Sequence, residues 1–309
     1  MNASPASARA EPLRRRGARP RRWLPWALLA PAVLTLLLLY GLPLLALIPL
    51  SLSEQVDRFS LRTVFTGRLQ TYGDVLRLHG PVLMRSLTDA SLSTALGLLI
   101  AYPLAWTISF RGGRWKGALI ALVVLPFFTS YLVRAIAWTT LLADAGPVLA
   151  LLRHLHLLPF LQGLGVIVDG RLLHTPAAVI GGLTYNSMPF LVLPLVVAME
   201  RIDPLLLEAA ADLYASPLRR FLAVEWPLSR PGLVSGVLLS LIPAAGDVVN
   251  PRFLGGPNDR MIANVMENLL LVQQRAPQVA ALTLVMMALI SCGLVAMLRG
   301  RSLQELPLP

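Results

Sequence analysis

Very few residues of this sequence have the types and spacing that enzyme chemistry needs. No Gly-x-x-x-x-Gly-Lys-Ser/Thr segment occurs, so the chain lacks the loop that holds ATP phosphates in P-loop proteins. No Gly-x-Ser-x-Gly segment offers a nucleophile for hydrolysis. His154 and His156 are two residues apart, but a catalytic zinc site uses three protein ligands and no third stands nearby in the sequence. We therefore expect neither catalytic residues nor a metal site.

Three polar residues stand instead inside apolar stretches, where such side chains are costly unless they face a cavity or a partner. They are Asp247, Arg134 and Asn186. Asp247 has two prolines and a glycine within four residues of it. Such interruptions of a membrane helix are tolerated where the released backbone groups find partners or line a water-filled cavity. We interpret these three residues as candidates for a path that carries a polar substrate.

Structural alternatives exist for two of these residues. Asp247 could cap a helix end or form an ion pair with Arg252, which lies five residues further along the chain. Arg134 should pair with an acid if it lies in such a path, and Asp144 and Asp247 are both candidates. The sequence does not choose between them.

The composition indicates that these residues belong to a membrane protein. Of the 309 residues, 56% are hydrophobic and 14% are charged, and the mean hydropathy is +0.67. Soluble domains are about half apolar and about a quarter charged. The net charge of +11 could suggest nucleic acid, but the basic residues stand between apolar stretches rather than among many polar ones. We expect a lipid bilayer and no nucleic acid as partner, and we interpret the lone Cys292 as a packing residue.

Six apolar stretches are long enough to cross a bilayer, which predicts an all-α membrane protein with six transmembrane helices. They run over residues 23–52, 83–110, 118–142, 176–199, 233–254 and 279–298. Between them we expect an outer loop over residues 53–81, with one short surface helix near Tyr72, and an amphiphilic connection over residues 144–175 with another.

The expected organisation has four parts. Residues 1–22 form a disordered basic tail, residues 23–82 the first transmembrane helix and its outer loop, residues 83–298 a five-helix core, and residues 299–309 a second tail. Most of the 27 Lys and Arg residues fall in the two tails, in the turn at residues 111–117 and in the segment 200–232. Because cytoplasmic segments are enriched in Lys and Arg, both termini and the segment 200–232 are expected in the cytoplasm.

The segment 200–232 is a polar island that predicts two short helices at the membrane surface. Asp203 followed by a proline is a helix start signal, and Ser216 followed by a proline repeats it. We expect the second helix to end at Pro227 and Pro231, because proline lacks the N–H that continues a helix. By itself this pattern also fits an ordinary amphipathic helix pair at the interface.

The island holds Glu208-Ala209-Ala210, then Asp212-Leu213 and Ala215-Ser216-Pro217, and finally Trp226-Pro227-Leu228 and Pro231-Gly232. This spacing resembles the EAA loop of permease subunits in binding-protein-dependent ABC importers. In that family the loop is a coupling helix that docks in a cleft of the cytoplasmic ATPase, and its glutamate is the most characteristic contact. The resemblance gives that role to Glu208. Tyr214 stands where the family usually has glycine, so the turn between the helices is either built differently or strained. The coupling residues implied are Glu208, Ala209, Ala210, Asp212, Tyr214, Ser216, Pro217, Pro227 and Gly232.

Three further segments, residues 130–138, 246–257 and 261–270, resemble the spermidine/putrescine branch of these permeases. The resemblance implies a type I ABC importer permease fold, in the bacterial inner membrane, that passes a polyamine from a periplasmic binding protein into the cytoplasm. It further implies a second homologous permease subunit, with a hetero-dimer expected, and a cytoplasmic ATPase dimer that binds the ATP. This chain would then be a transport subunit, neither an enzyme nor a holder of cofactors.

Other functions stay open at this point. A carboxylate with nearby aromatic faces suits a polyamine, which is a flexible polycation, whereas Arg134 would repel it unless an acid neutralises the arginine. Related permeases move ferric iron, sulfate, thiamine, phosphonates or opines. A secondary transporter would need ion-coupling acids in both halves of an internal repeat, and no second copy of the elements above appears. A membrane-embedded enzyme would need a cluster of His, Asp or Glu on facing helices.

Overall fold

The computed structural model describes residues 24–56, 62–213 and 216–302. Contacts divide the chain into two units, residues 1–47 and 48–309. The predicted tail at residues 1–22 lies outside the described residues. Of the second tail, predicted over residues 299–309, residues 299–302 belong to the last helix and the rest lies outside the described residues. In the first unit, α1 (Leu24–Leu36), the π-helical η1 (Leu37–Gly41) and the first part of α2 (Leu42–Ser51) follow one another without a break. The described side chains of this run are almost all exposed, as expected of a helix that faces lipid.

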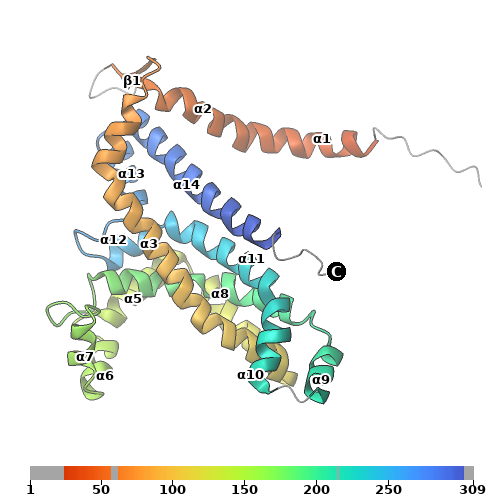
Figure 1. Cartoon of the computed structure of the whole chain (residues 1–309). Helices are drawn as coiled ribbons and strands as arrows, with labels where there is room; N and C mark the ends of the chain where they lie inside the picture. Colours follow the sequence, from red (N-terminus) through yellow and green to blue (C-terminus); the bar gives the residue numbers. More distant parts are fainter. Residues whose placement is uncertain (1–23, 57–61, 214–215, 303–309) are drawn as a thin grey trace, which may run out of the picture. The chain divides into compact units, whose positions relative to one another are not determined.

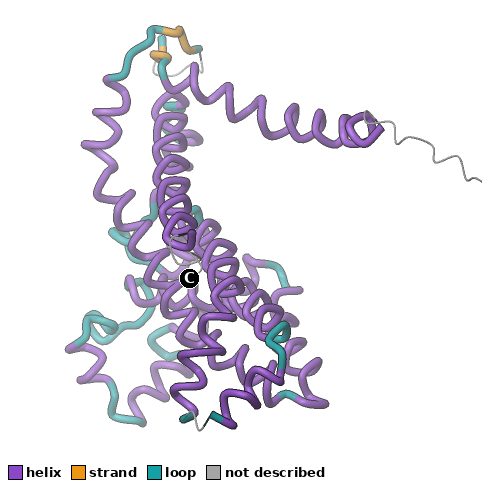
Figure 2. Tube along the Cα trace, turned by 45° about the vertical axis from the view of Figure 1, so that its right-hand side comes forward, coloured by secondary structure: helices purple, strands orange, loops and turns teal. Residues whose placement is uncertain are grey.

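A small antiparallel sheet follows α2. Strand β1 (Ser53–Gln55) pairs with β2 (Thr63–Phe65), and Glu54 lies opposite Val64. This hairpin, orange in Figure 2, was not predicted, because three-residue strands leave no alternating pattern that a sequence could reveal.

The next helix, α3 (Gln70–Trp106), is longer than predicted. The expected loop up to residue 81 is wrong after Leu69, because the residues around Tyr72 form the first turns of this helix and Pro81 does not end it. One proline removes a single backbone hydrogen bond, which packing elsewhere along the helix can offset. The buried side of α3 is rich in small residues that allow close helix packing: Ser86, Ala90, Ser93, Thr94, Gly97, Ala101 and Ala105.

The predicted third span is interrupted. After the π-helical η2 (Thr107–Arg111) and the short η3 (Gly113–Trp115), α4 (Lys116–Val124) leads into the 3₁₀ segment η4 (Leu125–Phe128). Thr129 and Ser130 are extended, and α5 (Tyr131–Leu142) starts anew. The connection that follows holds two short helices rather than one, α6 (Pro147–His154) and α7 (Leu158–Gly163).

Helix α8 (Pro176–Met199) matches the predicted fourth span. It packs against α3 and against α11 (Trp226–Ala245), and the three lie side by side in Figure 1. The backbones of α8 and α11 approach closely at Gly232, where an added Cβ would stand 2.5 Å from both the Cβ of Ala198 and the carbonyl oxygen of Pro194. These three helices form the centre of the second unit.

The second helix of the polar island does not end where predicted. Helix α9 (Pro204–Asp212) is separate, but α10 (Pro217–Arg220), the π-helical η5 (Phe221–Glu225) and α11 form one continuous helical run. Pro227 lies directly after the π-helical η5 and Pro231 one turn further on, so both stand inside this run. The prediction that these prolines end the helix is therefore wrong, because packing of α11 on α3 and α8 outweighs the lost hydrogen bond.

The predicted fifth span breaks at Gly246, where α11 has ended at Ala245 and the short α12 (Val249–Leu254) follows. Helices α13 (Ile262–Leu271) and α14 (Ala276–Ser302) complete the chain. Within the described residues, six helical stretches are long and apolar enough to cross a membrane, as predicted: Leu29–Ser51, Gln70–Arg111, Tyr131–His154, Pro176–Met199, Pro217–Ala245 and Ala276–Ala296.

Candidate functional site

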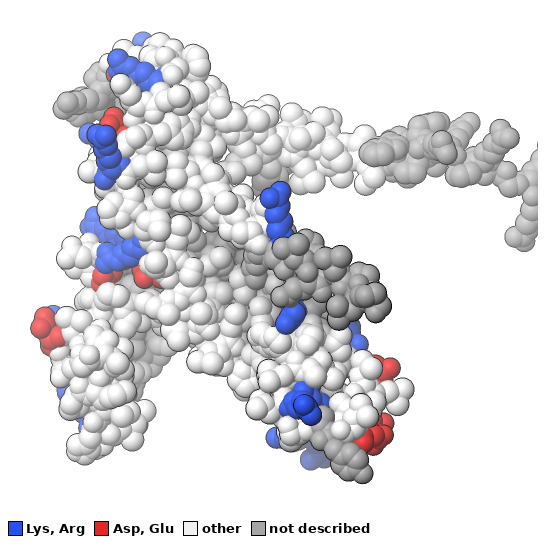
Figure 3. Space-filling model, viewed as in Figure 1, with Lys and Arg blue, Asp and Glu red and all other residues white. Residues whose placement is uncertain are grey.

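Helix α9 begins as the sequence predicted. The side chain of Asp203 caps it, with 2.9 Å between its Oδ1 and the backbone nitrogen of Leu205, and Ser216 caps α10 by accepting from the backbone nitrogen of Arg219 at 3.3 Å. Side chains of this kind satisfy backbone donors that a helix start leaves without an intrahelical partner. The two helices lie beside each other near the end of α3, where Figure 3 shows basic and acidic side chains close together.

The surface of α9 is both acidic and apolar. Glu208 and Ala209 are exposed and Ala210 is half-buried, while the side chains of Leu205 and Leu213 are 67% and 82% exposed. Large exposed apolar side chains grouped around a charged residue are typical of a protein contact surface. The arrangement therefore suits docking, with the small alanines leaving room for close approach.

The other residues predicted for coupling divide into two groups. Asp212, Ser216 and Pro217 are exposed beside α9, and Tyr214 lies outside the described residues. Pro227 and Gly232 are placed elsewhere, inside α11, where Gly232 is buried against α8. The structure thus groups the predicted coupling residues of α9 with those at the start of α10. Pro227 and Gly232 do not belong to this group, because they lie inside α11.

A buried carboxylate that the sequence analysis missed joins this region to α3. Glu225 is 3% exposed, accepts a hydrogen bond from the indole nitrogen of Trp106 at 2.6 Å and pairs with the Nε of Arg220 at 3.2 Å. Next to it, the hydroxyl groups of Tyr102 and Ser229 are 2.8 Å apart. The available signal was an acidic residue between apolar residues in the second half of the polar island.

Asp247 lies in the break between α11 and α12 and is 8% exposed. Its Oδ1 accepts from the backbone nitrogens of Val249 and Asn250 at 2.7 and 3.2 Å, so it caps the start of α12. Its Oδ2 accepts from the side-chain amide of Asn250 at 2.6 Å and from the hydroxyl group of Tyr131. The cap alternative is confirmed. The pairing with Arg252 is wrong, because Arg252 forms its ion pair with Glu267 on α13.

Arg134 is stabilised by neutral groups rather than by the acid expected. Its Nη1 donates to the carbonyl oxygens of Pro126 and Thr129, each at 3.2 Å, and its guanidinium group lies 4.5 Å from the ring centre of Phe127. The predicted pairing with Asp144 or Asp247 is wrong. Asp144 instead pairs with Arg171. Arg134 bonds to carbonyl groups that the break before α5 leaves within hydrogen-bond distance.

Asn186, on α8, faces the same region. Its side-chain nitrogen is 3.5 Å from Oδ1 of Asn250, and its own Oδ1 is buried with no hydrogen-bond partner among the described residues. Together with Arg134, Asp247 and the aromatic side chains of Phe127 and Tyr131, it lines a cavity of about 550 Å³. The structure therefore brings the three predicted path residues together at one place, which we call the central cavity.

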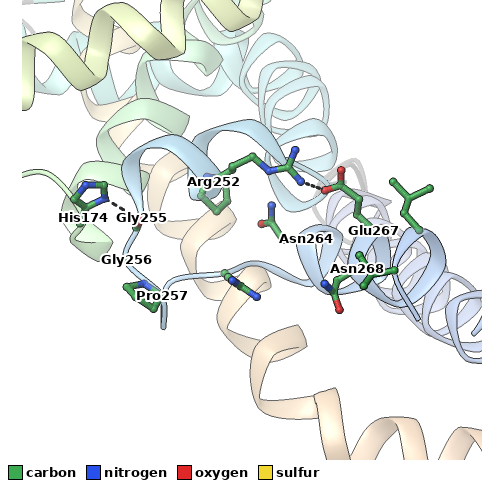
Figure 4. A pocket seen from close by; sticks show the side chains of 12 residues that line it. His174, Arg252, Gly255, Gly256, Pro257, Asn264, Glu267 and Asn268 are labelled. Carbon is green, nitrogen blue, oxygen red and sulfur yellow. Dashed lines mark hydrogen bonds and ion pairs between the residues drawn. The ribbon is translucent and has the colours of Figure 1, made fainter. Parts of the chain in front are cut away.

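A second hollow of about 610 Å³ lies between the segment after α12 and α13. Figure 4 shows the ion pair of Arg252 and Glu267 on its wall, with His174 bonded to the carbonyl oxygen of Gly255 at 3.2 Å. This hollow is near the first half of α3, because the backbone nitrogen of Ile262 donates to Ser86 at 2.7 Å. Across the described ranges, no three His, Cys, Asp or Glu side chains are grouped so that they could hold a metal ion.

Comparison with known proteins gives one family match and several relatives. The model of a family described as "binding-protein-dependent transport system inner membrane component" matches residues 93–299. The spermidine/putrescine transport system permease protein PotB of Escherichia coli (strain K12) is 36% identical over 234 residues, which cover 75% of this chain and 81% of that protein. The inner membrane ABC transporter permease protein YdcU of the same strain is 35% identical over 235 residues, or 72% and 73% of the two chains.

Two more distant likenesses agree with these. The molybdenum transport system permease protein ModB of Azotobacter vinelandii is 32% identical over 167 residues, which are 54% of this chain and 69% of that protein. A solved chain of a bacterial ABC transporter involved in the import of the acidic polysaccharide alginate superposes with a TM-score of 0.56 over 93% of this chain and 97% of its own. It is 17% identical, so this likeness concerns the fold alone.

Proposed function

Because the chain belongs to the family of inner-membrane components of binding-protein-dependent transport systems, we propose that it forms one half of the membrane path of an ABC importer for polyamines such as spermidine or putrescine. Membership confirms the resemblance drawn from the segment 200–232, and with it a multi-pass permease subunit of the inner membrane. The predicted six-helix permease fold is confirmed as well.

The choice of polyamine is supported by the relatives. PotB, which is named for spermidine and putrescine, shares 36% identity over three quarters of this chain. None of the relatives described above is named for ferric iron, sulfate, thiamine, phosphonate or opine, so those alternatives are not favoured. A buried carboxylate and aromatic rings in the central cavity suit a flexible polycation.

The observation that carries the coupling role is the exposed surface of α9. Its leucines surround Glu208 without any partner from the described residues covering them, which is the surface a docking helix needs. We assign the partner as a cytoplasmic ATPase dimer that binds and hydrolyses the ATP, so that this chain itself needs no cofactor. Glu208 would contact that ATPase, and Ala209 and Ala210 would allow it to approach closely.

The same proposal sets the orientation and the remaining partners. With α9 facing the ATPase, both termini lie in the cytoplasm, in line with the excess of Lys and Arg in those segments. The hairpin, α6, α7 and the hollow beside α13 then face the periplasm, where a substrate-binding protein delivers its cargo. A second homologous permease subunit supplies the other half of the path.

Movement of α9 can reach the central cavity through a continuous connection. Helix α10, η5 and α11 form one run that ends at the break holding Asp247, and Glu225 fastens this run to α3. In the mechanism we propose, ATP binding closes the ATPase dimer and displaces α9. The helices of the second unit then turn as a body relative to the partner permease, which opens the path outward, and hydrolysis resets it.

The test is uptake by proteoliposomes that hold this chain, its partner permease and its ATPase, supplied with the binding protein and with labelled putrescine or labelled spermidine. We expect ATP-dependent uptake that Glu208→Lys abolishes by reversing the charge at the docking surface, while the subunit stays inserted. The matched control for the docking step is Glu54→Lys, because Glu54 lies on the hairpin and its pair with Arg68 is solvent-exposed. This variant should co-purify with the ATPase as the original protein does, whereas Glu208→Lys should not.

The outcomes separate the parts of the proposal. Uptake of neither polyamine, with ATPase activity still stimulated by another loaded binding protein, would reject the polyamine and keep the importer. Normal uptake by the Glu208→Lys variant would reject the coupling role. A chain that never co-purifies with an ATPase would reject the importer mechanism itself.

A further inference from the structure

A site built for a cation lies at the break between η4 and α5, on the wall of the central cavity. The guanidinium group of Arg134 lies over two aromatic rings, 4.5 Å from the centre of one and 5.4 Å from the centre of the other, and donates to two backbone carbonyl oxygens at 3.2 Å. We call this site the cation seat, and it consists of the rings of Phe127 and Tyr131 and the carbonyl oxygens of Pro126 and Thr129.

The chemistry of the cation seat is not specific to arginine. Aromatic faces attract any cation placed over them, and alkylammonium groups are recognised in this way by ligand-binding proteins. Carbonyl oxygens accept hydrogen bonds from an ammonium group as readily as from a guanidinium group. The extended backbone at Thr129 and Ser130 takes the carbonyl group of Thr129 out of regular helix bonding, so it can accept from a cation. The carbonyl oxygen of Pro126 also accepts from the hydroxyl group of Thr129 at 2.7 Å and shares its lone pairs between this donor and the cation.

Two opposite charges share this cavity without pairing. In the part of the chain that the structure describes, neither Arg134 nor Asp247 forms an ion pair. Asp247 is satisfied by neutral donors, and Tyr131 joins the two sites, because its ring faces Arg134 while its hydroxyl group donates to Asp247. The Nε of Arg134 is buried and has no hydrogen-bond partner among the described residues. One donor of the resident arginine is therefore left unsatisfied in the cation seat.

We propose that the cation seat is a substrate subsite, which Arg134 occupies between transport events and which an ammonium group of the polyamine takes over during transport. This inference rests on the polyamine function proposed above. An ammonium group in the seat would be separated from the carboxylate of Asp247 by the side chain of Tyr131. The second ammonium group of the polyamine could then contact that carboxylate. Because the arginine leaves the seat when the substrate arrives, its charge in the path does not conflict with a cationic substrate.

Binding of labelled putrescine to the purified importer, measured without binding protein and without ATP, tests the proposal. Arg134→Gln removes the competing charge and keeps side-chain donors for the two carbonyls. We expect this variant to bind putrescine about tenfold more tightly than the original protein, because the ligand no longer displaces a resident cation. In the same background, Phe127→Leu should cancel the gain, because it removes one aromatic face.

Arg153→Gln is the matched control, since Arg153 is an exposed arginine of α6 outside the central cavity, and it should leave putrescine binding unchanged. If Arg134 only braces the helix break, Arg134→Gln would bind putrescine no more tightly than the original protein, and the proposal would be overturned. Should that variant fail to assemble, Phe127→Trp with Arg134 retained gives a second readout. Putrescine should then change the fluorescence of the new indole saturably, and the absence of a saturable change would overturn the proposal.

This measurement is independent of the proposed function, because it involves neither uptake nor ATP. An importer that takes up no polyamine in proteoliposomes would reject the polyamine function, whatever the binding result. Unchanged putrescine affinity in the Arg134→Gln variant of an importer that does take up polyamines would reject the cation seat alone.

Discussion

Trp106 donates a hydrogen bond from its indole nitrogen to the buried carboxylate of Glu225, with 2.6 Å between Nε1 and Oε2. Trp106 is the last residue of α3 and Glu225 the last of η5. This bond therefore links the helical run of α10, η5 and α11 to α3. The guanidinium group of Arg111 lies over the indole ring of Trp106, 4.8 Å from its centre. Trp106 and Glu225 thus connect two helices in the region between α9 and the central cavity.

Replacing Trp106 by phenylalanine should therefore destabilise the folded protein. The variant keeps an aromatic ring but leaves the buried Oε2 of Glu225 without its donor, which costs about 1–3 kcal/mol. The expected result is a lower midpoint of thermal unfolding in detergent. Trp115→Phe is the control, because Trp115 is 62% exposed, and it should change the stability by less than about 0.5 kcal/mol. Equal midpoints for the two variants would show that the bond contributes nothing measurable.

Gly232→Ala should disturb the packing of α11 on α8. The added Cβ would stand 2.5 Å from the backbone oxygen of Pro194, and backbone cannot move aside cheaply, so we expect a loss of about 1–3 kcal/mol. Gly181→Ala on α8 is the matched control, since nothing lies within 4 Å of the added Cβ and alanine favours helix. Thermal unfolding of both variants measures the difference, and a neutral Gly232→Ala would contradict the packing role.

Asp203→Ala should loosen α9 without affecting the core. Loss of an N-cap costs about 1 kcal/mol of helix stability, so backbone amides of α9 should exchange with deuterium about fivefold faster. Asp212→Ala at the other end of the same helix is the control. An acid near a helix C-terminus is unfavourable, so its removal should slow exchange slightly or leave it unchanged. Faster exchange in Asp212→Ala than in Asp203→Ala would refute the cap.

Asp247→Asn should reduce polyamine uptake at least tenfold while the complex still assembles and binds its ATPase. The substitution keeps the size of the side chain but removes the negative charge from the central cavity, and it turns an NH₂ group toward one of its donors. Asp144→Asn, at an exposed pair with Arg171, should leave uptake unchanged. Unchanged uptake with a normal amount of Asp247→Asn in the membrane would reduce Asp247 to a helix cap.

The helices and their starts could be predicted because those signals are local. Long apolar stretches identified six membrane helices, and α8 has its predicted bounds. Asp203 and Ser216 cap the helices that they were expected to start, since an N-cap side chain bonds to a nitrogen only two or three residues away. The same holds for family membership, which the spacing in the segment 200–232 predicted and the family match over residues 93–299 confirms.

Prolines and partners of charged residues could not be predicted in the same way. Pro227 and Pro231 lie inside a helical run, whereas Gly246 lies where that run ends. Packing against α3 and α8 stabilises the helix enough to offset the hydrogen bonds that the prolines remove, and the sequence does not show this packing. Arg134 and Asp247 share the central cavity as expected, but the carbonyls and hydroxyl that satisfy them come from residues whose approach no spacing reveals.

By itself, the sequence determined the class of protein, the number of membrane helices, the helix starts of the segment 200–232 and the residues that are costly in lipid, since these depend on composition and on neighbours along the chain. Only the tertiary structure decided that Arg134 lies on aromatic faces, that Asp247 accepts from neutral donors and that Glu225 is bonded to Trp106. The physical reason is that a buried charge must be satisfied by whichever groups the folded helices bring within hydrogen-bond distance.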